Sequence, residues 1–133
     1  MTWLLDTNAC IRYLNGRSPK LRAKFDATDP THIRVCSVVK AELYFGAALS
    51  NDPSKTLANQ RLFLSRFLSL PFDDSAAEAY AGIRADLTRR GLIIGPNDLM
   101  IAAICRANGV TLITHNVNEF DRVGGLKIDD WEA

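Results

Sequence analysis

The sequence is poor in cysteine and has no long apolar run. Its three cysteines, Cys10, Cys36 and Cys105, lie far apart in apolar stretches and form no C-x-x-C pair. A disulfide framework and a zinc site are therefore disfavoured, and we expect buried, reduced thiols. No apolar segment approaches the roughly 18 residues of a membrane span, and no basic-then-apolar signal peptide opens the chain. We expect a soluble, cytoplasmic protein that does not bind a membrane.

An excess of charge is missing as well, since the net charge is +1. This value neither requires nor excludes a nucleic-acid partner, because phosphate binding depends on where the charges lie. The sequence also contains no internal repeat, low-complexity segment or linker. Its 133 residues, 47% of them hydrophobic, are typical of one domain with a real core, since domains cluster around roughly 100–150 residues. We expect a single domain over residues 1–133.

Strand and helix patterns alternate along the chain. Apolar, β-branched runs predict strands at residues 3–5, 33–37, 68–72, 110–113 and 126–128. Helical spacing of apolar residues predicts helices at residues 9–14, 18–27, 38–49, 53–68, 75–90 and 98–105. This alternation indicates an α/β fold with a parallel sheet of four or five strands and helices on both faces.

Local capping signals predict where several helices begin. Ser18-Pro19 and Asp52-Pro53 each place a capping residue before a proline in the first turn. Ser75 and Glu78 form a capping-box pattern, which predicts a helix start at Ser75 and gives Glu78 a structural role. Asn97 is a good cap for the helix that contains Asp98.

The first candidate for chemistry is Asp6, where the apolar run of residues 3–5 stops and is followed by Thr7 and Asn8. In open α/β sheets, ligands bind beyond the carboxyl ends of the strands. The alternative is that Asp6, Thr7 or Asn8 only caps the following helix, because all three residue types accept bonds from free amides. Taken alone, Asp6 fits a cap better than a catalytic residue.

Three further acidic residues, Glu42, Asp98 and Glu119, are candidates for the same site as Asp6. Glu42 falls on the helical face that points toward the protein body, although a carboxylate at the edge of that face would reach solvent. Asp98 stands in the first turn of a largely apolar helix, where Asn97 already serves as a cap. The strand at 110–113 ends in Thr114, His115 and Asn116, and Glu119 follows.

These oxygen-bearing side chains are expected to converge at one edge of the sheet. Oxygen ligands in one cleft suit hard divalent cations, which activate water and stabilise the leaving oxygen of a phosphodiester. The chemistry indicates a nuclease. A haloacid-dehalogenase-like phosphatase would need a second acid where Asn8 stands. A response-regulator receiver would need paired acids near the first strand and a lysine after a late strand, and neither is present.

Four segments in order carry a resemblance over nearly the whole chain: LLDTN, SVVKAELYFGA, GPNDLMIAAICRANG and LITHNVNEFDRVGGLKIDDW. With these motifs the sequence resembles PIN-domain ribonucleases of the VapC toxin type. The resemblance implies a PIN-like three-layer sandwich and a Mg²⁺- or Mn²⁺-dependent endoribonuclease, neutralised by a VapB-type antitoxin. The family's acidic quartet would fall on Asp6, Glu42, Asp98 and the position of Asn116. Either Glu119 supplies the missing acid, or Asn116 binds an ion or its water through its carbonyl oxygen.

We therefore expect Asp6 and Asp98 to bind metal, and Glu42 to bind metal or to orient the attacking water. The residues expected to fix the carboxylates or the substrate are Thr7, Asn8, Thr114, Asn116 and Glu119. His115 is expected to pack or to contact phosphate rather than metal. The expected substrate is unpaired RNA or a tRNA loop, because proteins read RNA sequence mostly where bases are unpaired. Resemblance extends this to the anticodon region of initiator tRNA.

Two expectations concern partners. The apolar helix that starts at Ser54, together with Tyr44 and Phe45, exceeds what a small sheet needs for cover and predicts a homodimer. The antitoxin is expected to lay a chain segment across the acidic cleft, with an inserted basic side chain displacing metal or RNA. The alternative from another class is a non-catalytic PIN module that binds RNA or a protein through the same cleft.

Overall fold

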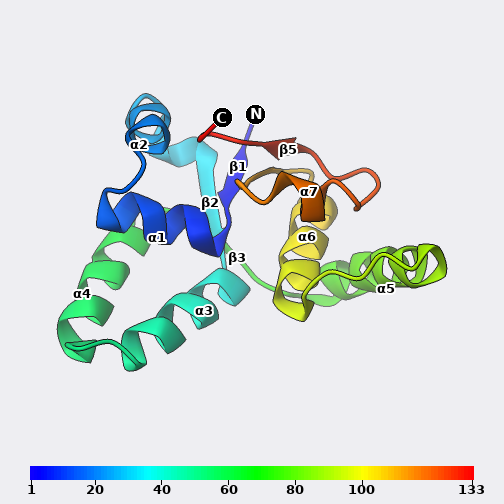
Figure 1. Ribbon diagram of the computed structural model, residues 1–133, viewed down its shortest axis with the longest axis horizontal. Coiled ribbons are helices and arrows are strands. Elements are labelled where there is room, and N and C mark those ends of the chain that lie inside the picture. The colour runs from blue at the N-terminus through cyan, green and yellow to red at the C-terminus, as the bar shows by residue number, and fades with distance from the viewer.

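The fold alternates short parallel strands with helices (Figure 1). A computed structural model describes all 133 residues. The elements are β1 (Trp3–Leu5), α1 (Thr7–Asn15), α2 (Pro19–Asp26), the 3-10 helix η1 (Pro30–His32), β2 (Ile33–Cys36), α3 (Ser37–Ala48), α4 (Pro53–Leu64), β3 (Leu68–Leu70), α5 (Asp74–Arg90), α6 (Pro96–Asn108), β4 (Thr111–Ile113), α7 (Val117–Phe120) and β5 (Ile128–Asp129).

The five strands form one sheet in the order β3-β2-β1-β4-β5, and every neighbouring pair is parallel. The chain moves outward from β1 to β3 and then returns to β4 on the other side of β1. Because parallel crossovers are right-handed, this reversal sends the later helices to the opposite face. Figure 1 shows α1 to α4 on one side of the strands and α5, α6 and α7 on the other. The predicted α/β sheet with helices on both faces is confirmed.

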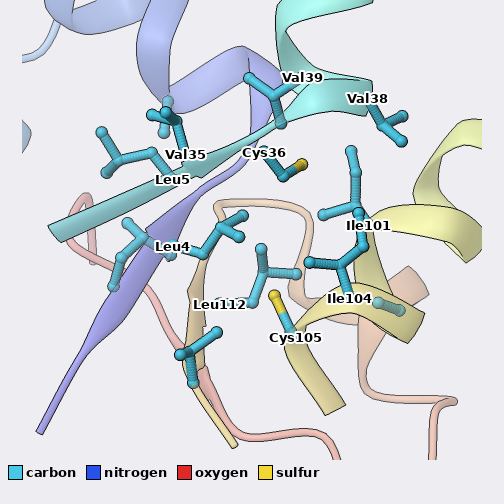
Figure 2. Packing of buried hydrophobic residues seen from close by; sticks show 14 of the residues in the cluster. Leu4, Leu5, Val35, Cys36, Val38, Val39, Ile101, Ile104, Cys105 and Leu112 are labelled. Carbon is cyan, nitrogen blue, oxygen red and sulfur yellow. The ribbon is translucent and has the colours of Figure 1, made fainter. Parts of the chain in front are cut away.

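The core lies on both faces of the central strands. Buried side chains from β1, β2 and β4 meet those of α3 and α6 in Figure 2, including Leu4, Val35, Val39, Ile104 and Leu112. The central strands β1, β2 and β4 are largely buried on both faces, so their sequences are mainly apolar rather than alternating, with Arg34 and Thr111 as exceptions. As predicted, the three cysteines are buried and unpaired. Together these contacts fix the sheet edge on which the polar residues stand.

The structure corrects two predicted helix starts. Helix α5 is capped by Asp73, whose Oδ1 accepts a hydrogen bond of 3.0 Å from the Ala76 amide. The predicted capping box at Ser75 is therefore wrong, because Asp73 already takes the cap and Ser75 lies inside the helix. Helix α6 begins after Gly95 with Pro96 in its first turn, so Asn97 is inside the helix and is not its cap. Fixed backbone geometry at Pro96 sets this start.

Other local predictions are confirmed. Ser18 and Asp52 cap α2 and α4, each with a proline in the first turn. Strand β3 lies at the sheet edge, which suits the proline that follows it. Helix α7 was not predicted, because four residues carry too little periodicity to be recognised. None of the helices combines the length and the apolar content needed to cross a membrane.

Candidate active site

The candidate site lies where the order of the strands reverses, between β1 and β4. Leu5 pairs with Ile113, and the Asp6 amide donates a hydrogen bond of 3.1 Å to the Ile113 carbonyl. Asp6 and Thr114 are therefore the first residues beyond two adjacent strand ends. Such a reversal opens a crevice at the carboxyl edge of an α/β sheet, where ligands bind. The expected convergence of Asp6 and Thr114 is confirmed.

Asp6 is both a helix cap and a buried acid. One oxygen, Oδ1, accepts a hydrogen bond of 2.8 Å from the Ala9 amide, and only 5% of the residue is exposed. Burial raises the pKa of Asp6, hydrogen bonds from Thr114 and Ala9 lower it, and the charges of Glu132 and Glu42 raise it again. The cap does not exclude a second role, since Oδ1 alone receives the Ala9 amide. The two roles that the sequence left open for Asp6, helix cap and catalytic residue, are therefore compatible.

Glu42 is held by the residue that follows Asp6. Thr7 Oγ1 donates a hydrogen bond of 2.5 Å to Glu42 Oε1, which joins the start of α1 to the middle of α3. Glu42 is partly buried, and it lines a pocket of about 650 Å³ together with Thr7, Asn8 and Asn97. Glu42 therefore lies between the two alternatives that the sequence left open, neither buried in the core nor fully exposed, and Thr7 holds one oxygen of its carboxylate.

The charges of the other acids contribute to the pKa of Asp98. Its pKa is raised to about 6, first because burial removes water and then because of the charges of Glu119, Glu42 and Asp6. A shift from neighbouring charges requires short distances, because charge interactions weaken with separation and with solvent screening. The acids at the start of α1 and on α3, α6 and α7 therefore lie near one another and form an acidic cluster, although no three of their oxygens lie within 4.8 Å of one another.

Glu119 occupies the place beside Asp98. Its Oε1 accepts a hydrogen bond of 3.0 Å from the Gly95 amide, and its Oε2 accepts one of 2.7 Å from Asn116 Nδ2. Both bonds lower the pKa of Glu119. A Cβ built on Gly95 would lie 3.7 Å from Asp98 Oδ2 and 4.0 Å from Glu119 Oε1, so both carboxylates lie against this glycine. Asn116 thus orients a carboxylate that stands three residues after it.

The donor set fits a divalent cation. No basic side chain is among the principal groups that shift the pKa of Asp6 or Asp98. Carboxylates at close range are unfavourable unless one takes up a proton or a cation neutralises them. Hard oxygen donors are the ligands that Mg²⁺ and Mn²⁺ prefer. The cluster can therefore hold a metal beside a bound phosphate.

His115 stands apart from this cluster. Its Nδ1 lies 3.0 Å from Asp130 Oδ2, and 62% of its side chain is exposed. Ligand atoms of His115, Asp130 and Glu132 lie within 4.8 Å of one another, but Glu132 already forms an ion pair with Arg12. A cation there would compete with the Arg12 guanidinium. That His115 packs or contacts phosphate rather than binding metal stays a prediction.

This combination of fold and acids has known relatives. The family model described as "PIN domain" matches residues 3–126. The chain belongs to the PIN domain family. Relatives of this PIN domain include the tRNA(fMet)-specific endonuclease VapC of Shigella flexneri, which is 38% identical over 131 residues and 98% of each chain. Ribonuclease VapC2 of Haemophilus influenzae is 34% identical over the same share of both chains.

Solved structures agree with the PIN assignment. A crystal structure of DNA-bound VapBC from Salmonella typhimurium is similar with a TM-score of 0.92 and 35% identity, over 98% of both chains. VapBC2 from Rickettsia felis, bound to a promoter DNA fragment, is similar with a TM-score of 0.90 and 31% identity, over 98% of this chain and 99% of that one. The predicted resemblance to VapC proteins of the PIN family is confirmed.

Some residues of this PIN domain site escaped the sequence prediction. Gly95 holds Glu119 through its backbone amide, and Glu132 adds its charge to the surroundings of Asp6. Arg12 pairs with Glu132 across 120 positions of sequence. Sequence patterns do not show these contacts, because they arise only when α7 packs beside the start of α6 and when the C-terminal segment packs beside α1.

Proposed function

We propose that this PIN domain is a metal-dependent endoribonuclease of a toxin–antitoxin pair, in which residues 1–133 act as one domain. The observation that supports it most is the position of the acids: Asp6 stands at the end of β1, where the strand order reverses, and the carboxylates of Asp98 and Glu119 lie together against Gly95. The names of the relatives from Shigella flexneri and Haemophilus influenzae, an endonuclease and a ribonuclease, favour RNA as substrate. The tRNA(fMet) specificity in the first name favours initiator tRNA as the substrate. A cut in the anticodon region and action in the cytoplasm are further parts of the proposal.

Asp6 and Asp98 would hold the ion, which we expect to be Mg²⁺ with Mn²⁺ as a substitute. Glu119 would complete the set, because Gly95 and Asn116 hold its carboxylate ionised beside Asp98. A bound ion supplies activation of water and neutralisation of the charge that develops on the phosphate.

Glu42 either joins the ligands or accepts a hydrogen bond from the attacking water. Thr7 holds one Glu42 oxygen, so the carboxylate is oriented while its other oxygen makes no hydrogen bond within the protein and could accept one from the water. Attack of the water oxygen on phosphorus breaks the bond to the 3′ oxygen and leaves a 3′-hydroxyl and a 5′-phosphate. Thr114 supports Asp6, and exposed Asn8 is available to the substrate.

The proposed protein partner is a VapB-type antitoxin, since the solved relatives are VapBC complexes. An apolar pocket of about 680 Å³ between α1 and α4 is lined by Leu14, Leu62 and Phe63. It shares Ile11 with the pockets on either side of Asn8, so one peptide segment could cover both the apolar pocket and the acids. A basic side chain of that segment would displace metal or RNA.

The chain is also proposed to form a homodimer. Phe45 and Leu49 on α3 are 67% and 72% exposed, and Leu62 on α4 is 73% exposed. Tyr44, by contrast, packs partly against the core. Exposed apolar side chains on two adjoining helices are typical of a surface that another chain covers.

The test is incubation of the purified, antitoxin-free protein with total tRNA and Mg²⁺ or Mn²⁺, with cut ends mapped by sequencing. Discrete cleavage that disappears in EDTA and in the Asp6→Asn variant is the expected result. If folded wild-type protein cuts tRNA, messenger RNA and ribosomal RNA no more than the variant does, the nuclease proposal is wrong. The protein would then be a binding module for RNA or a partner.

A further inference from the structure

A polar pocket opens beside Asp6, on the side away from Glu42. Its volume is about 490 Å³, and only one of its eight lining residues, Ile11, is hydrophobic. Asp6 and Asn116 line one part of it, and Arg12, Arg17 and His115 line the rest. The pocket thus adjoins the proposed metal ligands yet contains two guanidinium groups. Neither guanidinium forms an ion pair with Asp6 or Asp98, since Arg12 pairs with Glu132 and Arg17 forms no ion pair.

Arg12 is anchored at one nitrogen and free at the others. Its Nε donates to Glu132 Oε1, and the Glu132 side chain is only 8% exposed. The two terminal nitrogens of Arg12 make no hydrogen bond or ion pair within the protein, and 42% of its side chain is exposed. A buried carboxylate therefore holds the guanidinium plane while the outer nitrogens remain available. Such a fork matches two oxygens of a phosphate.

Arg17 is brought to the same place by the end of α1. Gly16 adopts a left-handed conformation with φ of 71°, and the Arg17 amide then donates to the Arg12 carbonyl at 3.2 Å and to Asn15 Oδ1 at 3.0 Å. Glycine is suited to this reversal, because a side chain disfavours positive φ. The Arg17 guanidinium forms no ion pair and no hydrogen bond within the protein. Both arginines therefore present unused donors beside the acidic cluster.

The spacing decides which phosphate these donors meet. Arg12 lies six residues beyond Asp6, which is roughly 9 Å along the axis of α1 at the usual rise per residue. A phosphate held there is displaced from the reacting phosphate at Asp6. We infer that this pocket is an RNA subsite in which Arg12 and Arg17 bind the backbone phosphate next to the one that is cleaved. The inference rests on the proposed nuclease function and assigns to it a substrate-binding subsite.

The subsite also explains the pair formed by Arg12 and Glu132. An arginine that is anchored before the substrate arrives loses less conformational freedom on binding. His115 also lines the pocket. Its Nδ1 pairs with Asp130, so only Nε2 remains for the substrate. Phosphate contacts of this kind position the RNA and do not read its sequence. The pocket should therefore affect affinity and register more than the chemical step.

Binding of RNA without cleavage gives the direct test. A fluorescent anticodon stem-loop of initiator tRNA is titrated in EDTA with wild-type protein and with Arg12→Gln and Arg17→Gln. Each substitution should weaken binding by about tenfold, the value expected for a lost charge-assisted hydrogen bond. The plot of log K against log salt should flatten by about 0.7 for each lost single-strand phosphate contact. Arg89→Gln, on the exposed C-terminal turn of α5, is the matched control and should change neither value.

A modified RNA shows whether the arginines bind one particular backbone phosphate. Neutral methylphosphonate is placed in turn at the linkages that flank the cleavage site. Wild-type protein should lose about tenfold in affinity at one of these linkages, as for a lost charge-assisted hydrogen bond. Arg12→Gln should lose less affinity there than wild-type protein, because only the Arg17 contact with that phosphate is left to lose. Arg17→Gln is informative even if Arg12→Gln unfolds, because the Arg17 side chain has no partner in the fold.

The outcomes separate this inference from the proposed function. If wild-type protein cleaves RNA in an Asp6-dependent way but both arginine variants keep the wild-type KM and salt dependence, the subsite is wrong and the nuclease stands. If no cleavage occurs but binding depends on Arg12, Arg17 and one linkage, the subsite stands and the nuclease proposal is wrong. In an active enzyme, the variants should raise KM about tenfold and leave kcat within about twofold, as expected for lost uniform binding.

Discussion

Asn116 Nδ2 donates a hydrogen bond of 2.7 Å to Glu119 Oε2, and this contact joins the end of β4 to the acidic cluster through α7. The asparagine stands where the resemblance implied a fourth acid. A carboxylate is nevertheless present in the cluster, because one turn of helix places Glu119 against Asp98 and Gly95. Of the two alternatives left open by the sequence, this geometry favours Glu119 as the fourth acid.

Glu119→Gln is expected to weaken Mg²⁺ binding and to lower RNA cleavage by about 10- to 100-fold, the range typical of groups that support a metal site. The substitution removes a negative charge beside Asp98 while keeping a similar shape. The Mg²⁺-dependent rise in Tm, measured by thermal unfolding, should be smaller than in wild-type protein. Glu78→Gln is the control, since Glu78 is exposed on α5. Unchanged Mg²⁺ response and cleavage in Glu119→Gln would contradict a role for Glu119.

The fold was largely predictable, because its signals are local. Apolar runs that end in polar residues marked β1, β2 and β4, and proline after a capping residue marked α2 and α4. The errors were also local, since Asp73 rather than Ser75 caps α5. Asp6, Glu42 and Asp98 were predicted from their positions in the elements and from resemblance; the structure places them near one another, and their role as metal ligands stays a prediction.

Contacts between distant segments were not predictable. The partner of Glu42 is Thr7, and the partner of Arg12 is Glu132, 120 residues away. Neither contact follows from periodicity, because each depends on how helices and the C-terminal segment pack. The position of Glu119 depends on α7, whose four residues are too few to show a helical pattern.

Substitutions at Asp6 should separate its charge from its capping bond. Asp6→Asn keeps a good helix cap and removes the negative charge, so cleavage should fall by about 100-fold or more while Tm is maintained. Asp6→Ala removes both, and should also lower the free energy of unfolding by about 1 kcal/mol. Urea unfolding and a cleavage assay measure the two effects. Wild-type activity in folded Asp6→Asn would exclude Asp6 from the chemistry.

Thr7 is expected to act through Glu42. Thr7→Val removes the hydroxyl that donates to Glu42 Oε1 and keeps the side-chain volume, so cleavage should fall by about 10- to 100-fold. Thr7→Ser retains the donor and should recover most of the activity. The Mg²⁺ dependence of cleavage is measured for both variants. Equal activities of the valine and serine variants would mean that this hydrogen bond does not position Glu42.

Leu49→Asp tests the proposed homodimer. Leu49 is 72% exposed at the end of α3 and lines none of the pockets around the acids. A charge there should be tolerated by the monomer but not by an apolar contact between two chains. Light scattering at micromolar concentration should give a dimer mass for wild-type protein and a monomer mass for the variant. A monomeric wild-type protein would show that the proposal is wrong.

The stability of the metal-free protein should depend on pH through Asp98. Its pKa in the folded protein is about 6, whereas its ordinary value is 3.8, so folding favours the protonated form. This contribution is fully present below about pH 4 and is lost as pH rises through about 6. In EDTA, Asp98→Asn should therefore gain stability relative to wild-type protein between pH 4 and pH 7.5.

Mg²⁺ should reverse this dependence, because metal ligands must be deprotonated before they bind. The Mg²⁺-induced rise in the Tm of wild-type protein is expected to grow from pH 5 to pH 7.5, and to be largely lost in Asp98→Asn. The raised pKa of Asp6 acts in the same direction, so some pH dependence should remain in that variant. Thermal unfolding with and without Mg²⁺ measures both effects. If the wild-type response to Mg²⁺ were the same at both pH values, the acidic cluster would not be where the ion binds.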